Sequence, residues 1–319
     1  MKLSVNWLRE LVDLPDSVDE LCDRMTLLGL EVEEVEDFRL EYPNCVVAEV
    51  LEAGQHPDAD RLRVCKVSTG SEELDVVCGA PNARAGIKVA FAQVGAVLPG
   101  GVKIKKGKIR GQVSMGMICS EAELGLGAGA DGIIELDDDA VVGTPLDELF
   151  AIRDTIVEIE VTPNRPDWLS HVGVARELAA WYGKPLRLPR VSEEVEAVSD
   201  DGGWSIRIDD PDACLRFRGR LIDGVKVGPS PRHIRQRLIA LGQRPINCVV
   251  DASNYVLHEL GHPNHCFDRD KLAGRKIVLR RAGAGEKFTT LDDTERQLDE
   301  EHLLVADQKG GIALAGIMG

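Results

Sequence analysis

Five Val- and Ile-rich runs divide the first half of the chain: CVVAEVLEAG (45–54), LRVCKVSTG (62–70), LDVVCGAP (74–81), IKVAFAQVGAVLPGG (87–101) and GIIELDDD (132–139). Each run ends in Gly, Pro or Asp residues of the kind that make turns. Short strands this closely spaced are typical of a small closed sheet. The sequence therefore predicts an all-β barrel over residues 39–150.

Outside the predicted barrel, the chain mixes helices with strands. In the first 38 residues, Ser17 and Glu20 form a capping box that opens a helix, and a strand follows among glutamates. Residues 151–190 begin with a strand and continue with a helix that Ser170 precedes. Both segments are therefore expected to be of mixed α/β type.

A third unit is predicted from Trp204 onward, after an acidic stretch over 191–203 that resembles a linker. Ser230 is expected to cap a helix whose first turn holds Pro231, and a second helix is expected over roughly 249–260. The strand-like runs KIVLRRA, LLVAD and GIALAGIMG follow. The whole chain is therefore expected to be an α+β multidomain protein.

Composition argues against several classes of protein. No apolar run approaches the roughly 18 residues that a membrane helix needs, and the N-terminus is too polar for a secretory signal, so a cytoplasmic location is expected. The eight cysteines are scattered without a C-x-x-C pair, which disfavours a zinc ribbon or a disulfide framework. Because the net charge is −16, any nucleic-acid contact requires a local basic patch or a partner that supplies positive charge. The chain stops inside an apolar Gly-rich run, so we expect a fragment of a longer protein.

The string HELGH (258–262) matches H-E-x-x-H, the signature of zinc peptidases. That chemistry needs one helix that places His258 and His262 one turn apart, with Glu259 as the general base. Here Gly261 weakens the last turn, and Pro263 disfavours the helical conformation at the residue before it. The helix is therefore expected to end where the second ligand would lie, which favours a solvent-facing helix end over a zinc site.

A run of basic residues stands out in this acidic chain, within GGVKIKKGKIRG (100–111). Its members are Lys103, Lys105, Lys106, Lys108 and Arg110. If the run is extended, Lys106 and Lys108 share a face with Ile104 and Arg110, and the other two lysines lie opposite. On the rim of a barrel, such a stripe could follow a phosphate backbone; the alternative is a solvated charged strand. Phe91 is the one aromatic residue between 46 and 149, so contacts with RNA backbone or shape are favoured over base stacking.

A third candidate gathers polar residues in RPINCVVDASNYV (244–256) and GHPNHCFD (261–268). Four side chains could line a small pocket near a helix and the loop after it: Ser253, Asn254, His265 and Asp268. Local capping is the alternative, in which Asn247, Asp251 and Asn254 satisfy nearby backbone groups. The residues alone favour the capping interpretation.

Stretches spread along the chain resemble one family, the β subunit of bacterial phenylalanine–tRNA ligase. In the first half they are MKLSVNWLRELVDLPDSVDELCDRMTLLGLEVEEVE (1–36), HPDADRLRVCKVSTG (56–70), VVCGAPNARAGIKVAFAQVGAVLPGGVKIKKGKIRGQVSMGMICSEAELGL (76–126) and DGIIELDDDAVVGT (131–144). In the second half they are VTPNRPDWLSHVGVARELA (161–179), RPINCVVDASNYVLHELGHPNHCFDRDKL (244–272) and LAGIMG (314–319). The long string after residue 244 is the most specific of them.

The resemblance implies a particular division of the chain. Residues 1–38 and 151–190 would form one discontinuous α/β N-terminal domain, into which an OB-fold tRNA-binding barrel (39–150) is inserted. After the 191–203 linker, residues 204–319 would form an α+β B3/B4 editing-type domain that is truncated at its C-terminus.

The resemblance also implies partners and cofactors. The family forms an α2β2 heterotetramer whose α subunit holds the aminoacylation site. ATP and Mg²⁺ would serve that assembled enzyme, and neither a bound cofactor or metal nor a catalytic residue for aminoacylation is expected in this chain. The expected partners are the α subunit and tRNA(Phe), with no membrane and no DNA.

The family's β subunit hydrolyses tyrosine that is mischarged onto phenylalanine tRNA, because a hydrophobic pocket excludes an added hydroxyl poorly. By resemblance, the editing pocket holds Ser253, Asn254, Pro263, His265 and Gly316, and the basic run is the tRNA-binding surface. Ser253 stands where the family usually has threonine, which keeps a hydroxyl. The family's acidic residue for the tyrosine hydroxyl lies beyond the last residue given, so the chain alone is not expected to deacylate Tyr-tRNA efficiently.

Two other interpretations compete with a synthetase subunit. One is a free-standing OB-fold tRNA-binding protein, which the B3/B4-like string after residue 204 disfavours. The other is the zinc peptidase, and the family does not require histidine at position 258 or 262.

Overall fold

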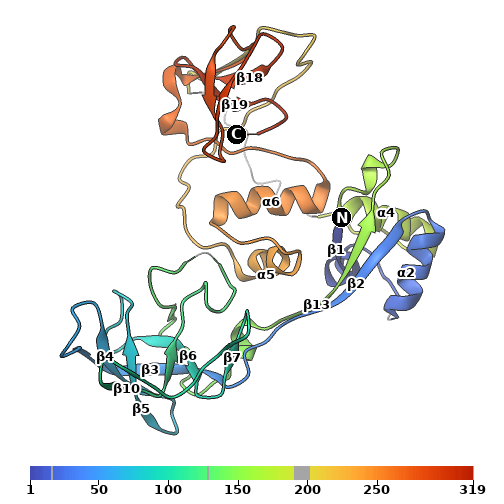
Figure 1. Ribbon diagram of the computed structural model, residues 1–319. Helices are drawn as coiled ribbons and strands as arrows, with labels where there is room; N and C mark the ends of the chain where they lie inside the picture. Colours follow the sequence, from blue (N-terminus) through green and yellow to red (C-terminus); the bar gives the residue numbers. More distant parts are fainter. Residues whose placement is uncertain (16, 128, 190–201, 319) are drawn as a thin grey trace. The chain divides into compact units, whose positions relative to one another are not determined.

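The computed structural model describes residues 1–15, 17–127, 129–189 and 202–318, and it is a mixed α+β protein (Figure 1). Contacts divide the chain into two units. The first unit consists of Met1–Leu188 and Gly228–Pro263, and the second consists of Pro189–Val227 and Asn264–Gly319. Most of the predicted linker over 191–203 lies outside the described residues; Gly202 and Gly203 form a turn with positive φ angles of 59° and 74°.

One part of the first unit is a three-stranded antiparallel sheet in the order β1 (Lys2–Ser4), β13 (Ile152–Glu160) and β2 (Glu31–Leu40). Because β13 pairs with both neighbours, it brings the segment after the barrel back onto the beginning of the chain. Three helices belong to this part: α1 (Val5–Leu11), α2 (Val18–Leu27) and α4 (His171–Tyr182). The short helix η1 (Pro166–Trp168) precedes α4.

The helix boundaries follow from capping side chains. The Ser17 hydroxyl accepts the Glu20 N–H at 3.2 Å, as the capping box predicts, and α2 begins there. The Ser170 hydroxyl accepts the Gly173 N–H at 2.9 Å and so caps α4. That helix ends at Gly183, which adopts the left-handed conformation with a φ of 60°.

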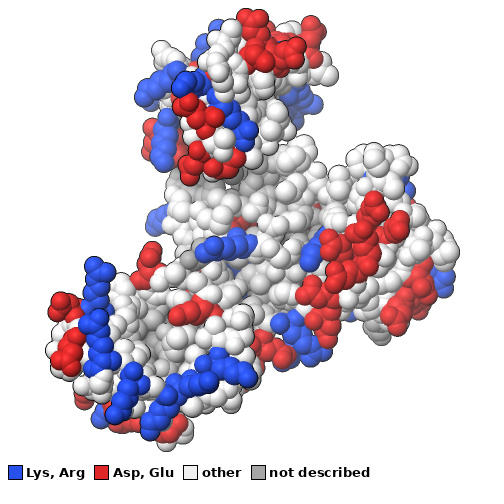
Figure 2. Space-filling model, in the orientation of Figure 1, with Lys and Arg blue, Asp and Glu red and all other residues white. Residues whose placement is uncertain are grey.

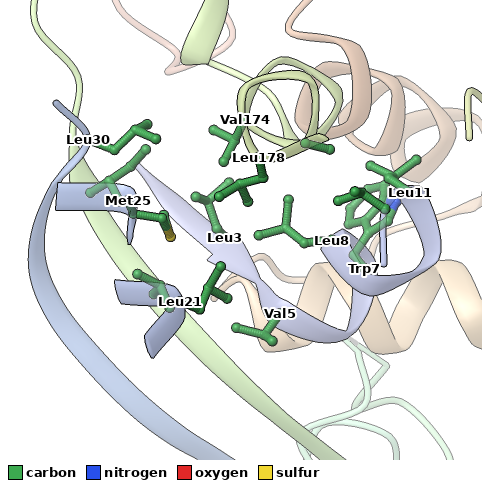
Figure 3. Close-up of a cluster of buried hydrophobic side chains, with 14 of the residues drawn as sticks. Leu3, Val5, Trp7, Leu8, Leu11, Leu21, Met25, Leu30, Val174 and Leu178 are labelled. Carbon is green, nitrogen blue, oxygen red and sulfur yellow. The ribbon is translucent and has the colours of Figure 1, made fainter. Parts of the chain in front are cut away.

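A shared core holds these helices on the sheet (Figure 3). Leu3 of β1 and Leu8 of α1 have no exposed surface, and Leu21 and Met25 of α2 lie beside them. Leu178 of α4 closes the cluster (Figure 3). Each such side chain contributes about 1.5–3 kcal/mol when it leaves water, so this cluster fixes the helix positions.

The second part of the first unit is a barrel-like sheet in the order β11-β6-β3-β4-β5, with β12 also paired to β6. Its strands are β3 (Cys45–Gln55), β4 (Arg63–Ser68), β5 (Glu73–Cys78), β6 (Lys88–Gln93), β11 (Gly116–Ile118) and β12 (Glu135–Leu136). Near its open side, the Met115 N–H donates to the Asp75 carbonyl at 2.8 Å, and the Val77 N–H donates to the Ser114 hydroxyl at 3.1 Å. The sheet is therefore nearly closed, which confirms the predicted barrel in outline.

Two hairpins and a short helix complete the barrel region. The first hairpin pairs β7 (Val97–Leu98) with β8 (Val102–Lys103), and the second pairs β9 (Gly107–Ile109) with β10 (Gln112–Ser114). The helix α3 (Leu146–Phe150) follows the last strand and buries Leu146 in the barrel core.

Two further helices, α5 (Arg232–Ala240) and α6 (Cys248–Leu260), pack on the first unit. The ring of Tyr255 lies 4.6 Å from that of Trp7, and Ala240 and Leu241 enter the core around β1. The contacts therefore group 228–263 with the first unit, whereas the sequence places these helices with the strands that follow.

The predicted cap of α5 is wrong. Pro231 occupies the N-cap position without a side-chain hydrogen bond. The hydroxyl of Ser230 donates instead to the buried carboxylate of Asp251 on α6. A long-range acceptor has taken the hydroxyl that local reasoning assigned to the helix end.

The second unit contains a four-stranded sheet in the order β14-β15-β18-β19. The strands are β14 (Ser205–Ile208), β15 (Lys276–Arg281), β18 (Leu303–Ala306) and β19 (Gly311–Leu314), with β14 parallel to β15 and the other pairs antiparallel. A separate hairpin pairs β16 (Lys287–Thr289) with β17 (Glu295–Gln297), and two short helices, η2 (Arg269–Lys271) and η3 (Ala273–Arg275), precede β15. The runs KIVLRRA and LLVAD thus contain β15 and β18, and the first four residues of GIALAGIMG form β19. Among the described residues, no helix is both long enough and apolar enough to span a bilayer.

Candidate nucleic-acid interface and candidate pocket

The basic run lies on the two hairpins of the barrel. Lys103 ends β8, Lys105 and Lys106 lie between the hairpins, and Lys108 is in β9. All of these side chains are exposed, as is that of Arg110. The run is therefore not one extended strand, so the condition under which Ile104 and Lys106 would share a face is not met.

Ile104 shows why the run is broken. Its side chain is only 7% exposed and belongs to the barrel core, and its N–H donates to the Ala96 carbonyl at 2.9 Å. Burial of this one apolar residue between two lysines anchors the run to the barrel. The lysines on either side of the anchor therefore remain at the surface.

The lysines have no acidic partners within the described part of the chain. Other basic residues of the barrel do have them: Lys66 pairs with Glu73, and Arg84 forms two bonds with Glu135. Among the described residues, no ion pair involves Lys103, Lys105, Lys106 or Lys108. Their charges are thus available for an external anion such as a phosphate.

Charge is segregated on the first unit. Figure 2 shows Lys and Arg gathered over the barrel, whereas Asp and Glu gather over the part that contains β2. That strand exposes Glu31, Glu33, Glu34 and Glu36. An acidic chain can therefore still present a positive surface locally.

A tight turn shapes the second hairpin. Arg110 and Gly111 both have positive φ, 46° and 88°, and Ile109 is paired with Gln112 across them. A two-residue hairpin loop with both central residues at positive φ is the arrangement that matches the twist of the strands. Arginine adopts this conformation at a cost, so contacts elsewhere must hold it.

Those contacts come from His56, which sequence reasoning missed. Its side chain is 2% exposed, and its Nδ1 accepts the Asp58 N–H at 3.0 Å. The proton is therefore on Nε2, which donates to the Ile109 carbonyl at 3.1 Å. The guanidinium of Arg110 in turn donates to the Asp58 carbonyl at 3.0 Å. In the sequence, the Arg110-Gly111 dipeptide was the available signal of a tight turn that needs such support.

The five residues assigned to the candidate pocket fall in both units. Ser253 and Asn254 are half-buried on α6, and Pro263 is exposed after that helix, all in the first unit. In the second unit, the exposed ring of His265 lies 4.5 Å from that of Phe267. Gly316, also exposed there, turns the chain with a φ of 74°.

Local capping accounts for several of the polar residues nearby. Asn247 caps α6 by accepting the N–H groups of Val249 and Val250 at 3.0 and 3.1 Å. Asp251 accepts the Ile246 N–H at 2.8 Å, in addition to the Ser230 hydroxyl. Asp268 accepts the Asp270 N–H at 3.1 Å and caps η2. The capping interpretation is therefore confirmed for Asn247 and Asp251.

The HELGH string does not form a two-histidine helix face. The helix α6 ends at Leu260, and Gly261 is left-handed with a φ of 69°. A Cβ at Gly261 would lie 2.9 Å from the Leu169 carbonyl oxygen. His262 therefore lies beyond the helix, which confirms the predicted helix end. Over the described residues, no group of three His, Cys, Asp or Glu side chains could hold a metal ion.

Comparisons with known proteins match the two segments in which the candidate residues lie. A family model described as a tRNA-binding domain matches residues 45–145, which include the whole basic run. A second model, the B3/4 domain, matches residues 213–319, which include all five candidate pocket residues. The phenylalanine–tRNA ligase β subunit of Geobacter metallireducens is 52% identical over all of this chain, which covers 40% of that subunit. Along its whole length, this chain is similar to part of the phenylalanine–tRNA ligase β subunit.

Other β subunits agree with this relationship. Those of Oleidesulfovibrio alaskensis and Fusobacterium nucleatum are 49% and 44% identical over the whole chain. The chain spans 40% of the length of each of these curated β subunits.

Proposed function

We propose that this chain is part of a phenylalanine–tRNA ligase β subunit and that its barrel is an OB fold that binds tRNA. The observation that carries the proposal is the set of exposed lysines on the barrel hairpins, which have no acidic partner in the described residues and lie inside the tRNA-binding match. Barrels of this type present oligonucleotide-binding surfaces on strands and loops. With few aromatic residues nearby, the barrel would contact the phosphate backbone and the folded shape of the RNA.

The proposal includes an assembly. The β subunit would pair with an α subunit in an α2β2 enzyme, and the α subunit would join phenylalanine to tRNA(Phe) with ATP and Mg²⁺. The name shared by the relatives, a β subunit, supports a second kind of chain. In this division of labour, the present chain contributes RNA contacts and leaves aminoacylation to its partner.

The proposal also includes editing by the B3/B4-type domain. Ser253, Asn254, Pro263, His265 and Gly316 would line a pocket in which water hydrolyses the ester of mischarged Tyr-tRNA(Phe). Their common position inside the 213–319 match supports the assignment. A second site of this kind is useful because one hydroxyl alters binding in an apolar pocket by only about 100-fold.

We propose the corresponding division of the sequence. Residues 1–38 and 151–190 would form the N-terminal domain, 39–150 the inserted OB fold, 191–203 a linker and 204–319 the editing-type domain. Pairing of β2 with β13 supports the discontinuous first domain. The helices α5 and α6 pack with the first unit, although they lie inside the B3/4 match. The last boundary therefore follows the sequence family and does not coincide with the division of the chain by contacts.

The salt dependence of RNA binding tests the tRNA-binding proposal. Titration of the chain with a tRNA(Phe) transcript at several salt concentrations gives the slope of log K against log salt. Lys108→Gln should weaken binding and reduce that slope by about 1, because one phosphate contact is lost. Lys184→Gln removes another exposed lysine, after α4, and should leave both quantities unchanged. Equal effects of the two substitutions would rule out a specific role for the hairpins.

Deacylation tests the editing proposal in the complete enzyme. Tyr-tRNA(Phe) hydrolysis would be measured with full-length β subunit and its α partner, using Ser253→Ala and His265→Ala. Both variants should deacylate more slowly while aminoacylation with phenylalanine continues. Normal deacylation by both variants would remove these residues from the pocket.

A further inference from the structure

We infer that His56 is a positioning residue for RNA binding: it joins the 56–62 loop to the β9–β10 turn, so that loop and hairpin form one rigid RNA-binding surface. The inference rests on the proposed tRNA-binding function and names the device that presents its lysines. It concerns how the surface is held, since His56 itself is almost fully buried and cannot touch RNA.

The first step is that both nitrogens of His56 are used. Nδ1 accepts the N–H of Asp58 within the loop, and Nε2–H donates to the Ile109 carbonyl at the end of β9. The imidazole thus spans the loop and the hairpin through two backbone partners. A neutral imidazole with the proton on Nε2 is the form that can donate at one nitrogen and accept at the other.

The second step is that the loop is itself fixed. The His56 N–H donates to the Leu62 carbonyl at 3.0 Å, which closes the loop at its base. The Gln55 amide donates to the Ala59 carbonyl at 2.8 Å and to the Leu62 carbonyl at 3.3 Å. A loop closed in this way is held by its own hydrogen bonds. It can therefore hold the hairpin in place and does not move with the turn.

The third step is the backbone of Arg110. A non-glycine residue in the left-handed conformation persists only where its surroundings determine it. Here the carbonyl of the preceding residue, Ile109, accepts from His56, and the guanidinium of Arg110 donates to the Asp58 carbonyl. The loop therefore holds the first half of the turn, at Ile109 and Arg110, in a conformation that the turn alone would adopt at a cost.

The fourth step is charge. Lys108 lies two residues before the turn, and the 56–62 loop carries a further exposed basic residue, Arg61. Fixing the loop to the hairpin therefore fixes positive charges from two separate stretches of sequence in one arrangement. A phosphate backbone then binds without the entropy cost of ordering the hairpin first.

His56→Asn is the decisive substitution. An asparagine carbonyl oxygen can still accept the Asp58 N–H, as in an Asx turn, but its shorter side chain does not reach the Ile109 carbonyl. With the whole chain and a tRNA(Phe) transcript, we expect binding to weaken about three- to tenfold, as expected when a few groups must be ordered on binding. The slope of log K against log salt should stay the same, because no positive charge is removed.

Asn82→Ala is the matched control. Asn82 also joins two loops of the barrel, since its amide donates to the Ile133 carbonyl and accepts the Ile133 N–H, both at 3.0 Å. It lies in a region without the basic run. This variant should lose thermal stability and keep its affinity for tRNA.

Arg110→Gly provides a second route if His56→Asn unfolds. Glycine relaxes the left-handed backbone but removes the bond to the Asp58 carbonyl. Lys108→Ala removes the same charge and serves as the comparison. Arg110→Gly should lose more affinity for tRNA than Lys108→Ala, although its melting temperature should not be lower. Equal losses in these two variants would overturn the inference.

The outcomes separate the inference from the function on which it rests. If the unaltered chain does not bind tRNA in a salt-dependent way, the proposed function fails and the inference fails with it. If the unaltered chain binds and His56→Asn binds equally well, only the inference is overturned. Weaker binding by His56→Asn with an unchanged salt slope, and normal binding by Asn82→Ala, would support it.

Discussion

His171 lies in the core of the first unit with no exposed surface. Its Nε2 accepts the Ser4 N–H at 3.0 Å, and its Nδ1–H donates to the His258 carbonyl at 2.8 Å, so the ring is neutral and both nitrogens are satisfied. Its ring also stacks on Trp7 at 4.2 Å. Burial lowers the pKa of His171 to about 3. One imidazole thus connects β1, α4 and the end of α6.

This pKa predicts an acid sensitivity. The pKa in the folded chain lies below the ordinary value of 6.5, so the unfolded chain binds the extra proton as pH falls. The stabilisation is complete above about pH 6.5 and is lost as pH falls towards 3. At pH 7.5, His171→Gln should lower the free energy of unfolding by about 2–3 kcal/mol. At pH 5.5, the difference from the unaltered chain should shrink by about 1.4 kcal/mol. Urea unfolding at both pH values measures this, and a pH-independent difference would contradict it.

Gly261 gives a second prediction at the scale of one residue. Alanine there would have to adopt positive φ and would place its Cβ 2.9 Å from the Leu169 carbonyl oxygen. Gly183 ends α4 in the same conformation, but a Cβ there would meet nothing within 4 Å. Gly183→Ala should therefore cost about 1 kcal/mol, and Gly261→Ala clearly more. Thermal unfolding of the two variants compares them directly; equal losses would mean that the contact with Leu169 relaxes at no cost.

At the scale of elements, Arg237 attaches α5 to its neighbours. Its guanidinium lies 4.6 Å from the centre of the Trp7 ring and 5.5 Å from that of Tyr255. It also forms an ion pair with Glu10 of α1. A half-buried guanidinium beside two aromatic faces contributes more than the same charge in solvent.

We therefore expect Arg237→Met to lower the free energy of unfolding by about 1–2 kcal/mol. Glu10→Gln removes only the ion pair, whose acidic partner is mostly exposed, and should cost less than about 1 kcal/mol. Denaturant unfolding of both variants distinguishes ring contacts from the ion pair. Equal losses would mean that the ion pair carries the effect.

The elements that could be predicted are those that depend on neighbours in sequence. The run 45–54 forms all but the last residue of β3, the run 62–70 contains β4, and Ser17 and Ser170 cap the helices α2 and α4. Ile104 escaped prediction because its burial in the barrel core divides a run that looks uniformly polar. Ser230 escaped because a carboxylate 21 residues later competes for its hydroxyl.

The candidate site was predictable to the same extent. The lysines are visible as a local run of charge, but their support is not, because the partner of His56 is a backbone carbonyl 53 residues away. Every residue has a backbone carbonyl, so the sequence does not indicate which one will accept a hydrogen bond from His56. The residues of the candidate pocket came from resemblance to a family, since their own chemistry is equally typical of caps and turns.

At the scale of the whole molecule, charge separates the parts of the first unit. The net charge of −16 suggests a poor partner for RNA, yet the barrel exposes four lysines without acidic partners among the described residues, and the glutamates gather over β2 (Figure 2). Net charge therefore says little about where such a chain binds nucleic acid; the local distribution decides.

The packing of α6 on Trp7 has a consequence for biosynthesis. Trp7 is synthesised before the barrel, α4 and α5, but its aromatic neighbour Tyr255 is made only after them. Until then, the indole face that Tyr255 covers stays accessible to water or to a chaperone. The nascent polypeptide can thus cover this face of Trp7 only when synthesis has passed α6, and a pause before that point would prolong the exposure.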